Sequence, residues 1–411
     1  MPRLLSSLLL LTLILAAAAA PSKPHGRSFK IRRQATGNTR VRNGVADMHK
    51  AYQKYGFPIS DAMTQAVAQS KFGASANAVS QSTVKQNGTT DATPEQGDSE
   101  FLSPVDFGGQ KLMMDFDTGS SDIWVFNTQL SAQENQGHTV FDPSKSKTFK
   151  AVQEGSFDVH YGDKSFATGS VGQESVTIGG ANVPNQAIGL PQKVAPQLVK
   201  DTRSNGLLGL AFKKLNTVQP EQQDTFFGNV GPSLLHNLFT ANLKHSTAGA
   251  YEFGNVDQTQ FVGKLNFGPV NASSGLWQFT SNTFMVGKGT PTQVPTAAPA
   301  IADTGTTLLL MDPVIVQAYY DQVQGAKLAG QGVVFPCTAS LPDLHIQLSP
   351  TYLGKIPGAL INFQPIGDGQ CMGGLQTNAG QNVQILGDVL FKSQFVVFEG
   401  SGPSIGFAEH A

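Results

Sequence analysis

The sequence is poor in charged residues, in cysteine and in long apolar runs. Charged side chains make up 14% of its 411 residues, against about 25% in a typical soluble domain. Hydrophobic residues make up 40%, which is enough for ordinary folded cores. After residue 20 no apolar stretch is long enough to span a bilayer, and no apolar tail of the kind that precedes a lipid anchor closes the sequence. We therefore expect no membrane anchor.

Motifs for metals, cofactors and nucleic acids are also missing. The eight histidines, among them His138, His160, His236 and His245, lack the spacing of metal ligands. Glycine is abundant, yet no phosphate-binding loop or dinucleotide motif occurs. Residues 86–411 carry 16 basic and 27 acidic residues, a net charge of −11, which disfavours nucleic acid. We expect no metal, no cofactor and no nucleic-acid partner.

The first twenty residues follow the order of a secretory signal peptide. Arg3 supplies a positive charge, an apolar segment runs from Leu4 to Leu15, and small residues precede Pro21. Residues 1–20 are therefore predicted to direct secretion to the extracellular medium, with the vacuole as the alternative destination. An uncleaved anchor helix is the competing interpretation of this segment.

A basic leader follows the signal peptide. Residues 1–85 contain 12 basic and two acidic residues, a net charge of +10. This charge is typical of a nucleic-acid-binding tail or of an electrostatic latch on an acidic body, and the preceding signal peptide favours a cleaved propeptide over residues 21–85. Within it, a helix is predicted from about Val45 to Tyr55, with one apolar face. Residues 68–99 are polar and aperiodic, as expected for a cleavable linker.

From about Phe101 onward the pattern predicts a mostly antiparallel, all-β protein. Short apolar runs are separated by Gly, Asn and Asp. Two helices are expected, over Pro232–Phe239 and over Pro313–Val323, the second with Asp312 as its N-cap. The predicted strands include Lys111–Phe116, Asp122–Phe126, Phe157–Tyr161 and Glu174–Ile178.

The two cysteines, Cys337 and Cys371, can form one disulfide. Pairing is favoured in an oxidising compartment. Closing a loop of about 35 residues would stabilise the fold by roughly 3–4 kcal/mol on the chain-entropy model. Two buried free thiols are the alternative.

An internal repeat divides the chain. Asp117-Thr118-Gly119 recurs as Asp303-Thr304-Gly305, and each motif is followed by an apolar run. An apolar-Gly turn lies downstream of each motif, at Gly209 and at Gly387. Two lobes of similar plan, each placing one Asp on a tight turn, explain the repeat. Two unrelated turns are the alternative, since Asp and Gly are common turn residues.

These motifs resemble the pepsin family of aspartic proteases, most closely its secreted fungal, aspergillopepsin-like branch. The resemblance extends from about Ser99 to Phe407. It implies a bilobal, all-β, pepsin-like fold with a central cleft and few short helices. We assign residues 86–268 to an N-terminal catalytic lobe and 269–411 to a C-terminal catalytic lobe.

The resemblance assigns catalysis to Asp117 and Asp303. Two adjacent carboxyls, one ionised and one protonated, can activate a water and protonate the leaving group without a metal or a covalent intermediate. Their mutual repulsion separates their titrations, so that one proton is shared at acidic pH. The family assignment makes Asp303 the base and Asp117 the acid, although the near symmetry of the pair leaves this open. Matching residues imply roles in support of the dyad for Ser120, Thr306 and Trp124.

Further matches imply substrate binding. Tyr161, Gly162 and Asp163 match the tip of the hairpin flap that closes over substrate, and Tyr161 would contact Trp124. The other matching positions are Gly119, Gly305 and Thr307. Leu198 lines an apolar subsite or belongs to the core. A pair of core aromatics is the simpler interpretation of Tyr161 and Trp124.

The leader also carries a matching motif. Lys54 and Tyr55 correspond to the propeptide pair that occupies the active site in family zymogens. The Lys54 ammonium would pair with the dyad, and acidification would weaken that attraction. An exposed lysine at a helix end is the alternative.

The sequence departs from many fungal relatives at Lys164 and Phe157. Lys164 beside Asp163 puts a preference for basic residues next to the scissile bond in doubt, whereas large hydrophobic residues are expected there. Asp115 lies on the same face of its strand as Asp117 and is interpreted as a tolerated residue rather than a third catalyst.

We expect a monomer that acts on protein and peptide substrates and that binds its own propeptide before activation. Asn87 and Asn271 head glycan acceptor motifs. Two other functions remain open. One is a glycosidase, which also uses paired carboxylates. The other is an inactive, pepsin-shaped binding protein.

Overall fold

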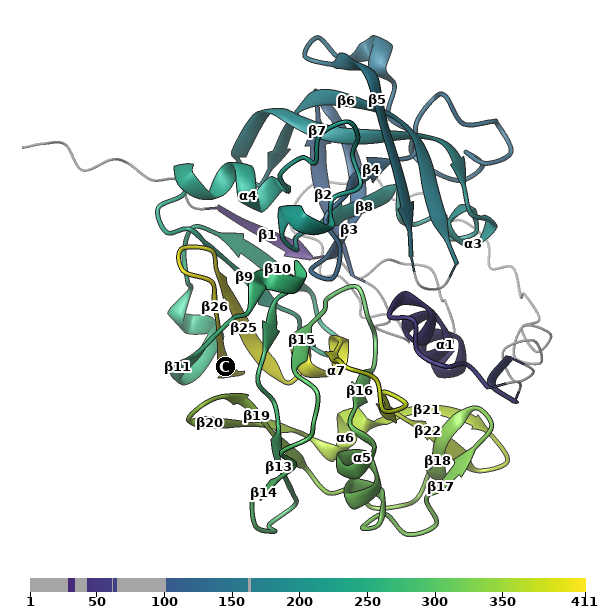
Figure 1. The fold of residues 1–411 in the computed structure, drawn as a ribbon, viewed down its shortest axis with the longest axis vertical. Coiled ribbons are helices and arrows are strands. Elements are labelled where there is room, and N and C mark those ends of the chain that lie inside the picture. Colours follow the sequence, from purple (N-terminus) through teal and green to yellow (C-terminus); the bar gives the residue numbers. More distant parts are fainter. Residues whose placement is uncertain (1–28, 34–42, 61, 65–100, 162–163) are drawn as a thin grey trace, which may run out of the picture.

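The structure is a computed structural model. It describes residues 29–33, 43–60, 62–64, 101–161 and 164–411. Figure 1 shows a β-rich lobe above, a second β-rich lobe below, and a helix of the leader, α1 (Gly44–Lys54), lying between them on one side. The expected all-β, bilobal, pepsin-like fold is therefore confirmed.

A twisted seven-stranded sheet forms the upper lobe. Strand β3 (Gln110–Asp117) pairs in parallel with β8 (Gly206–Gly209), and β8 pairs antiparallel with β4 (Ile123–Val125). This arrangement brings Asp117, the last residue of β3, to the strand end that faces the other lobe. In spatial order the strands are β2 (Leu102–Phe107), β3 (Gln110–Asp117), β8 (Gly206–Gly209), β4 (Ile123–Val125), β7 (Ala181–Val194), β6 (Phe166–Ile178) and β5 (Lys150–His160).

The lower lobe repeats the central pairing. Strand β15 pairs in parallel with β24, and β24 pairs antiparallel with β16, as in the upper lobe. The sheet order is β12 (Gln278–Phe279), β15 (Ala300–Ala302), β24 (Gln384–Leu386), β16 (Leu309–Met311) and β23 (Leu375–Thr377). Two four-stranded sheets complete this lobe. The first contains β14 (Thr292–Gln293), β13 (Thr283–Val286), β19 (Leu344–Ser349) and β20 (Tyr352–Ile356), and the second β17 (Lys327–Ala329), β18 (Gly332–Pro336), β22 (Gln370–Gly373) and β21 (Asn362–Gly367).

The glycines shared by the two repeats have the same structural role. Gly209 N donates to Asp122 O at 2.9 Å, and Gly387 N donates to Leu308 O at 3.1 Å. A Cβ atom at Gly209 or Gly387 would collide with the backbone of the loop that follows the Asp-Thr-Gly motif of the same lobe. The repeat therefore requires glycine where the downstream turn supports that loop.

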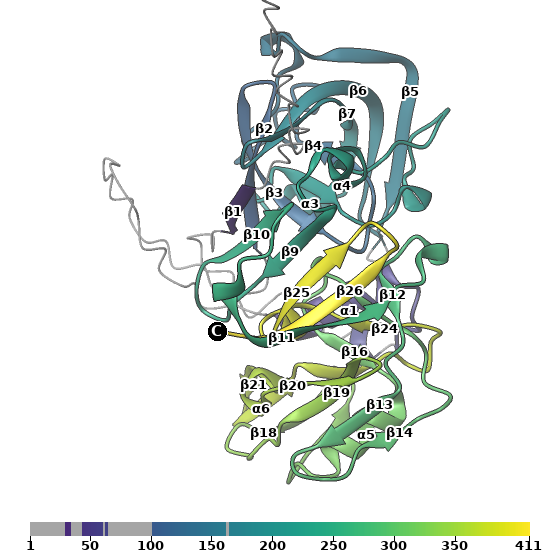
Figure 2. The same ribbon diagram turned by 90° about the vertical axis from the view of Figure 1, so that its left-hand side faces the viewer.

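A six-stranded sheet joins the lobes (Figure 2). Its first strand, from the leader, pairs antiparallel with β10 in the register Phe29 to Phe253. Trp277 lies in the core beside this sheet and contacts the rings of Phe239 and Phe398. The order is β1 (Phe29–Arg33), β10 (Gly249–Phe253), β9 (Leu238–Asn242), β25 (Gln394–Glu399), β26 (Ser404–His410) and β11 (Phe261–Pro269).

The helices are short. The expected N-cap is present on α5 (Pro313–Tyr320), where Val314 N donates to Asp312 Oδ1 at 2.9 Å. The remaining α-helices are α3 (Pro196–Val199), α4 (Phe226–Val230), α6 (Gly358–Ile361) and α7 (Asp388–Phe391), and the 3-10 turns are η1 (Pro143–Lys145), η2 (Lys213–Leu215), η3 (Gly231–Ser233), η4 (Gln258–Gln260) and η5 (Ala272–Ser274). Within the part of the chain that the structure describes, none of the helices has the length and hydropathy to cross a bilayer.

The helix expected over Pro232–Phe239 is wrong. The chain makes only the turn η3 there and enters β9 at Leu238. Phe239 is fully buried and stacks on Phe253 and Phe398 from the adjacent strands. Packing in the sheet therefore outweighs the local helical pattern.

The expected disulfide is present between Cys337 and Cys371, with Cα atoms 4.9 Å apart. It connects the end of β18 to β22, two strands that already pair through Phe335 and Cys371. The bond therefore closes a loop within the lower lobe.

Candidate active site

The two repeated loops place Asp117 and Asp303 at the junction of the lobes. Their side chains are almost completely buried, with 1% and 0% exposure. Each carboxylate accepts from the backbone N–H two residues later, Gly119 at 2.8 Å and Gly305 at 3.0 Å. Local backbone donors therefore hold both carboxylates in matching orientations, since a charged acceptor strengthens such bonds.

A hydroxyl donates to the other oxygen of each carboxylate. Ser120 Oγ lies 2.7 Å from Asp117 Oδ2, and Thr306 Oγ1 donates to Asp303 Oδ2. Ser120 and Thr306, two of the three residues expected to support the dyad, thus lie in equivalent positions of the repeat. Each hydroxyl stabilises the ionised form of its neighbouring carboxyl.

Two buried threonines link the loops across the lobes. Thr118 N donates to Thr304 Oγ1 at 3.1 Å, and Thr304 N donates to Thr118 Oγ1 at 3.0 Å. Each hydroxyl then donates to a carbonyl of the opposite lobe, Thr118 Oγ1 to Ala302 O at 2.8 Å and Thr304 Oγ1 to Phe116 O at 2.6 Å. This reciprocal network keeps the two carboxylates in register although they belong to different sheets.

The aromatic pair expected at the flap also comes together. Trp124 Nε1 donates to the hydroxyl of Tyr161 at 2.7 Å, and Trp124 is buried. Burial raises the Tyr161 pKa well above its ordinary value, so the phenol stays protonated. Gly162 and Asp163, the other residues expected at the flap tip, lie outside the described residues. Lys164, which follows them, has φ +60° and its N–H donates to Tyr161 O at 2.9 Å.

The leader reaches the dyad through the end of α1. Lys54 Nζ lies 3.0 Å from Asp117 Oδ1 and 2.9 Å from Asp303 Oδ2. The Tyr55 hydroxyl donates to Asp303 Oδ2 at 2.5 Å. The structure therefore brings Lys54 and Tyr55 together with both carboxylates.

An apolar face anchors α1 on the lower lobe. Asn43 caps the helix by accepting from Ala46 N at 3.1 Å, and Gly44 N donates to Gln364 Oε1 at 2.6 Å. The buried cluster beneath the helix contains Met48, Ala51, Tyr52 and Phe57 from the leader and Ile301, Leu308, Leu310, Phe363, Met372 and Ile385 from the lower lobe. Burial of this face fixes the direction in which Lys54 points.

The charges at the site shift the titration of every group in it. Burial raises the Asp117 pKa, and the neighbouring Asp303 raises it further, against the lowering effect of Lys54. Burial also acts to raise the Asp303 pKa, but Lys54 and the donors Thr306 and Tyr55 outweigh burial and leave this pKa below its ordinary value. Burial acts to lower the Lys54 pKa, yet the two carboxylates raise it well above its ordinary value. The site therefore contains an ammonium, an ionised Asp303 and the less acidic Asp117.

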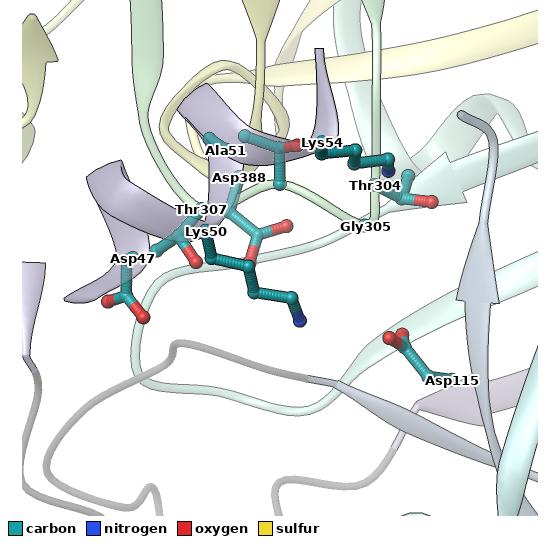
Figure 3. Close-up of a pocket in the computed structure, with 10 residues that line it drawn as sticks. Asp47, Lys50, Ala51, Lys54, Asp115, Thr304, Gly305, Thr307 and Asp388 are labelled. Carbon is teal, nitrogen blue, oxygen red and sulfur yellow. The ribbon is translucent and has the colours of Figure 1, made fainter. Parts of the chain in front are cut away.

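Thr307, expected to bind substrate, lines a cavity of about 30 Å³ beside the dyad with Gly305 and Asp115. Figure 3 shows Lys50 of α1 and Asp115 of β3 extending toward the same space from opposite sides. Asp115 is buried and lines this cavity. Leu198 is half-buried and packs on the cluster that contains Trp124.

The expected glycan acceptors differ in what the structure describes. Asn271 is exposed, and its side chain accepts from Ser273 N at 3.1 Å in the turn η5. Asn87 lies outside the described residues.

Sequence reasoning missed Asp122. This buried carboxylate lines a cavity together with Tyr55 and Tyr161. It accepts from Asn216 Nδ2 at 3.2 Å and from Thr217 N and Oγ1, each at 3.0 Å. Burial raises its pKa to about 6, against the lowering effect of the Thr217 donors. The only sequence signal for Asp122 is its position five residues after Asp117, because its donors lie 94 and 95 residues away.

Two β-rich lobes that each bring an Asp-Thr-Gly loop to one shared site define the pepsin-like class of proteins. Comparison with known proteins agrees with this geometry. Residues 100–410 match the model of the family described as eukaryotic aspartyl protease. The chain belongs to this family and is an aspartic endopeptidase.

Relatives resemble the chain over nearly its whole length. It is 46% identical to an aspergillopepsin A-like aspartic endopeptidase of Aspergillus fumigatus, over 99% of both chains. It is 44% identical to aspartic protease PEP3 of Coccidioides posadasii, over 99% of this chain and 95% of the relative. It is 41% identical to aspergillopepsin-1 of Aspergillus flavus, over 97% and 96% respectively.

Proposed function

We propose that the protein hydrolyses internal peptide bonds at acidic pH, with Asp117 and Asp303 as the catalytic residues. The observation that carries this proposal is the single ammonium, Lys54 Nζ, within 3.0 Å of both carboxylates. Two buried carboxyls that share one cation are close enough to share one water and one proton in its place.

The chemistry follows from the unequal titration of the two carboxyls. Asp303 has the lower pKa and acts as the base that takes a proton from the attacking water. Asp117 has the raised pKa and donates a proton to the carbonyl oxygen. When the resulting gem-diol collapses, Asp117 takes back a proton from one hydroxyl and Asp303 passes the proton that it took from water to the leaving nitrogen. Both carboxyls thereby return to their starting states, and no covalent intermediate with the enzyme forms. After the leader departs, Lys54 and Tyr55 no longer lower the Asp303 pKa, so the remaining asymmetry depends on Thr306 and on repulsion between the carboxylates.

The leader keeps the enzyme inactive as a zymogen. Lys54 and Tyr55 occupy the positions where a scissile peptide and its water would lie, and α1 covers the adjacent apolar surface. Acidification protonates the dyad and removes the attraction that holds Lys54. Residues 21–85 are then cut away, leaving catalytic lobes at 86–268 and 269–411.

A preference for large hydrophobic residues is supported by a second cavity of about 270 Å³ beside Tyr55. Val159, Tyr161, Leu215 and Leu276 contribute apolar surface to it. Burying a large side chain there stabilises the bound substrate by roughly 1.5–3 kcal/mol.

Residues 1–20 direct the protein to secretion, and Asn271 and Asn87 accept glycans on that route. The mature enzyme acts as a monomer, since both carboxylates and both threonines of the dyad network come from one chain.

The proposal is tested by cleavage of denatured haemoglobin between pH 3 and 7, with and without pepstatin. Wild type and Asp303→Asn are compared after removal of the leader. Acid activity that pepstatin abolishes and the variant lacks supports the dyad mechanism. A folded, leader-free wild type that cleaves no protein refutes it, with polysaccharide hydrolysis then favouring a glycosidase and inertness toward both favouring a binding protein.

A further inference from the structure

His138 is held between one aromatic ring and two backbone carbonyls. Its imidazole stacks on Phe126, with ring centroids 3.6 Å apart and an interplanar angle of 11°. Nδ1 lies 2.9 Å from Ser204 O, and Nε2 lies 3.1 Å from Val199 O. Both ring nitrogens therefore face acceptors at hydrogen-bond distance.

This geometry selects a protonation state. A carbonyl oxygen can only accept, so each contact is a hydrogen bond only when that ring nitrogen carries a proton. Neutral imidazole has one N–H and leaves the second nitrogen lone pair facing an oxygen. The imidazolium satisfies both carbonyls, and bonds from a charged donor are the stronger kind. The two contacts are therefore both hydrogen bonds only when each ring nitrogen carries a proton.

The two carbonyls belong to the two ends of the segment 199–204, which begins at the end of α3. Val199 is the last residue of α3, and Ser204 lies just before β8. The same segment is attached once more where Thr139 N donates to Asn205 Oδ1 at 2.7 Å. His138 thus joins the loop after β4 to both ends of residues 199–204.

Residues of α3 face the flap pair. Leu198 and Val199 pack, half-buried, on the cluster that contains Trp124, and Tyr161 packs on the same cluster. The Trp124–Tyr161 hydrogen bond measures 2.7 Å and lies beside the dyad loop. A shift of α3 therefore changes the apolar wall against which the flap pair rests.

Few other charges compete for His138. On its own loop Glu134 accepts from Ser131 Oγ at 2.7 Å. On the segment that it binds, Asp201 accepts from Arg203 Nε at 3.2 Å, and Lys200 is exposed. Phe126, on the third packed element, is uncharged. The carbonyls of Val199 and Ser204 are therefore the partners that stabilise the imidazolium.

We infer that His138 is a positioning residue. With both ring nitrogens protonated it fastens the C-terminal end of α3 and the segment 199–204 beside the flap pair, and with one proton it releases one of the two carbonyls. The kinetic consequence of this inference rests on the proposed peptidase function, because substrate would bind against the apolar surface that α3 forms beside the Trp124–Tyr161 pair. It adds a second proton-dependent contact to that of the dyad. Unlike the dyad, His138 acts on substrate binding rather than on the bond that is broken.

The kinetic test compares wild type, His138→Phe, His138→Gln and the exposed-histidine control His236→Gln, all after removal of the leader. His138→Phe keeps a ring on Phe126 but has no donor, and His138→Gln keeps one donor group. At pH 4 we expect KM for a peptide substrate to rise about three- to tenfold in His138→Phe and less in His138→Gln, with kcat within about twofold. His236→Gln is expected to match wild type. An unchanged KM in folded His138 variants at pH 4 overturns the inference.

A second readout needs no activity. The chain has two tryptophans, so the indole N–H signal of Trp124 can be identified in ¹⁵N NMR by its loss in Trp124→Phe. The full chain is used in an Asp303→Asn background, which prevents self-cleavage. Between pH 5 and 8 the Trp124 signal is expected to move, and His138→Phe or His138→Gln is expected to abolish that movement. Identical titration with and without His138 refutes the inference, whereas loss of haemoglobin cleavage alone refutes only the peptidase proposal.

Discussion

Replacement of Asp122 by asparagine is predicted to flatten the pH dependence of stability. Burial holds the folded pKa of Asp122 at about 6, above its ordinary 3.8. Between these values the folded protein retains a proton that the unfolded chain has released. Stability therefore falls as pH rises through this window, because the folded state binds more protons. Two pKa units correspond to about 3 kcal/mol in the free energy of unfolding.

Asparagine is a close test because it keeps the acceptor and removes the titration. Its Oδ1 can still accept from Asn216 Nδ2 and from the N–H and hydroxyl of Thr217, the three donors that Asp122 Oδ1 receives. At pH 4 Asp122 is protonated in the folded state, so the free energies of unfolding of Asp122→Asn and the parent are expected to differ by less than about 1 kcal/mol. At pH 7 it is expected to be more stable than the parent by about 3 kcal/mol.

The assay is urea unfolding followed by tryptophan fluorescence at pH 4 and pH 7. Both proteins carry Asp303→Asn, so that the leader remains attached while Lys54 keeps its contact with Asp117. Groups common to both proteins cancel in the difference. A difference between the two proteins that stays constant from pH 4 to 7 would refute the assignment of this proton to Asp122.

Three other changes test the zymogen contact, the disulfide and the link between lobes. Lys54→Met removes the ammonium shared by the dyad. Gel analysis is therefore expected to detect self-processing at a pH about one unit higher than in wild type. If self-processing began at the same pH as in Lys50→Met, a control on the same helix, the result would contradict this prediction. Cys337→Ser is expected to cost roughly 3–4 kcal/mol of unfolding free energy in urea, and a loss below about 1 kcal/mol would argue against it. Thr118→Val removes a buried hydroxyl that accepts from Thr304 N and donates to Ala302 O. We therefore expect the free energy of unfolding in urea to fall by about 2 kcal/mol and kcat to fall at least tenfold. A kcat equal to that of the exposed control Thr292→Val would refute the link between the lobes.

Features encoded within a few residues could be predicted from the sequence. The two Asp-Thr-Gly loops, the alternating strands around them and the cap of α5 depend on neighbours in the chain, and the structure contains all of them. The disulfide followed because two cysteines allow one pair. The repeated motif carried more information than any single strand, since it predicted two equivalent lobes.

Features that depend on distant backbone could not be predicted. The segment Pro232–Phe239 has a local helical pattern, and the partners that draw it into the sheet, Phe253 and Phe398, lie too far along the chain to be recognised from it. The contacts of His138 join carbonyls 61 and 66 residues away. A carbonyl is present at every position, so no side-chain pattern marks the two that bind His138.

The exchange of hydrogen bonds between Thr118 and Thr304 has the form of a contact between identical subunits. In a two-fold dimer each subunit gives its partner what it receives, and here Thr118 N and Thr304 N each donate to the other threonine's hydroxyl. A single half of this chain, paired with a copy of itself, could make the same four bonds. The present sequence is thus compatible with descent from a gene for one half that was duplicated and fused. Fusion freed the two halves to diverge, so that one cleft could come to recognise different side chains on either side of the bond it cuts.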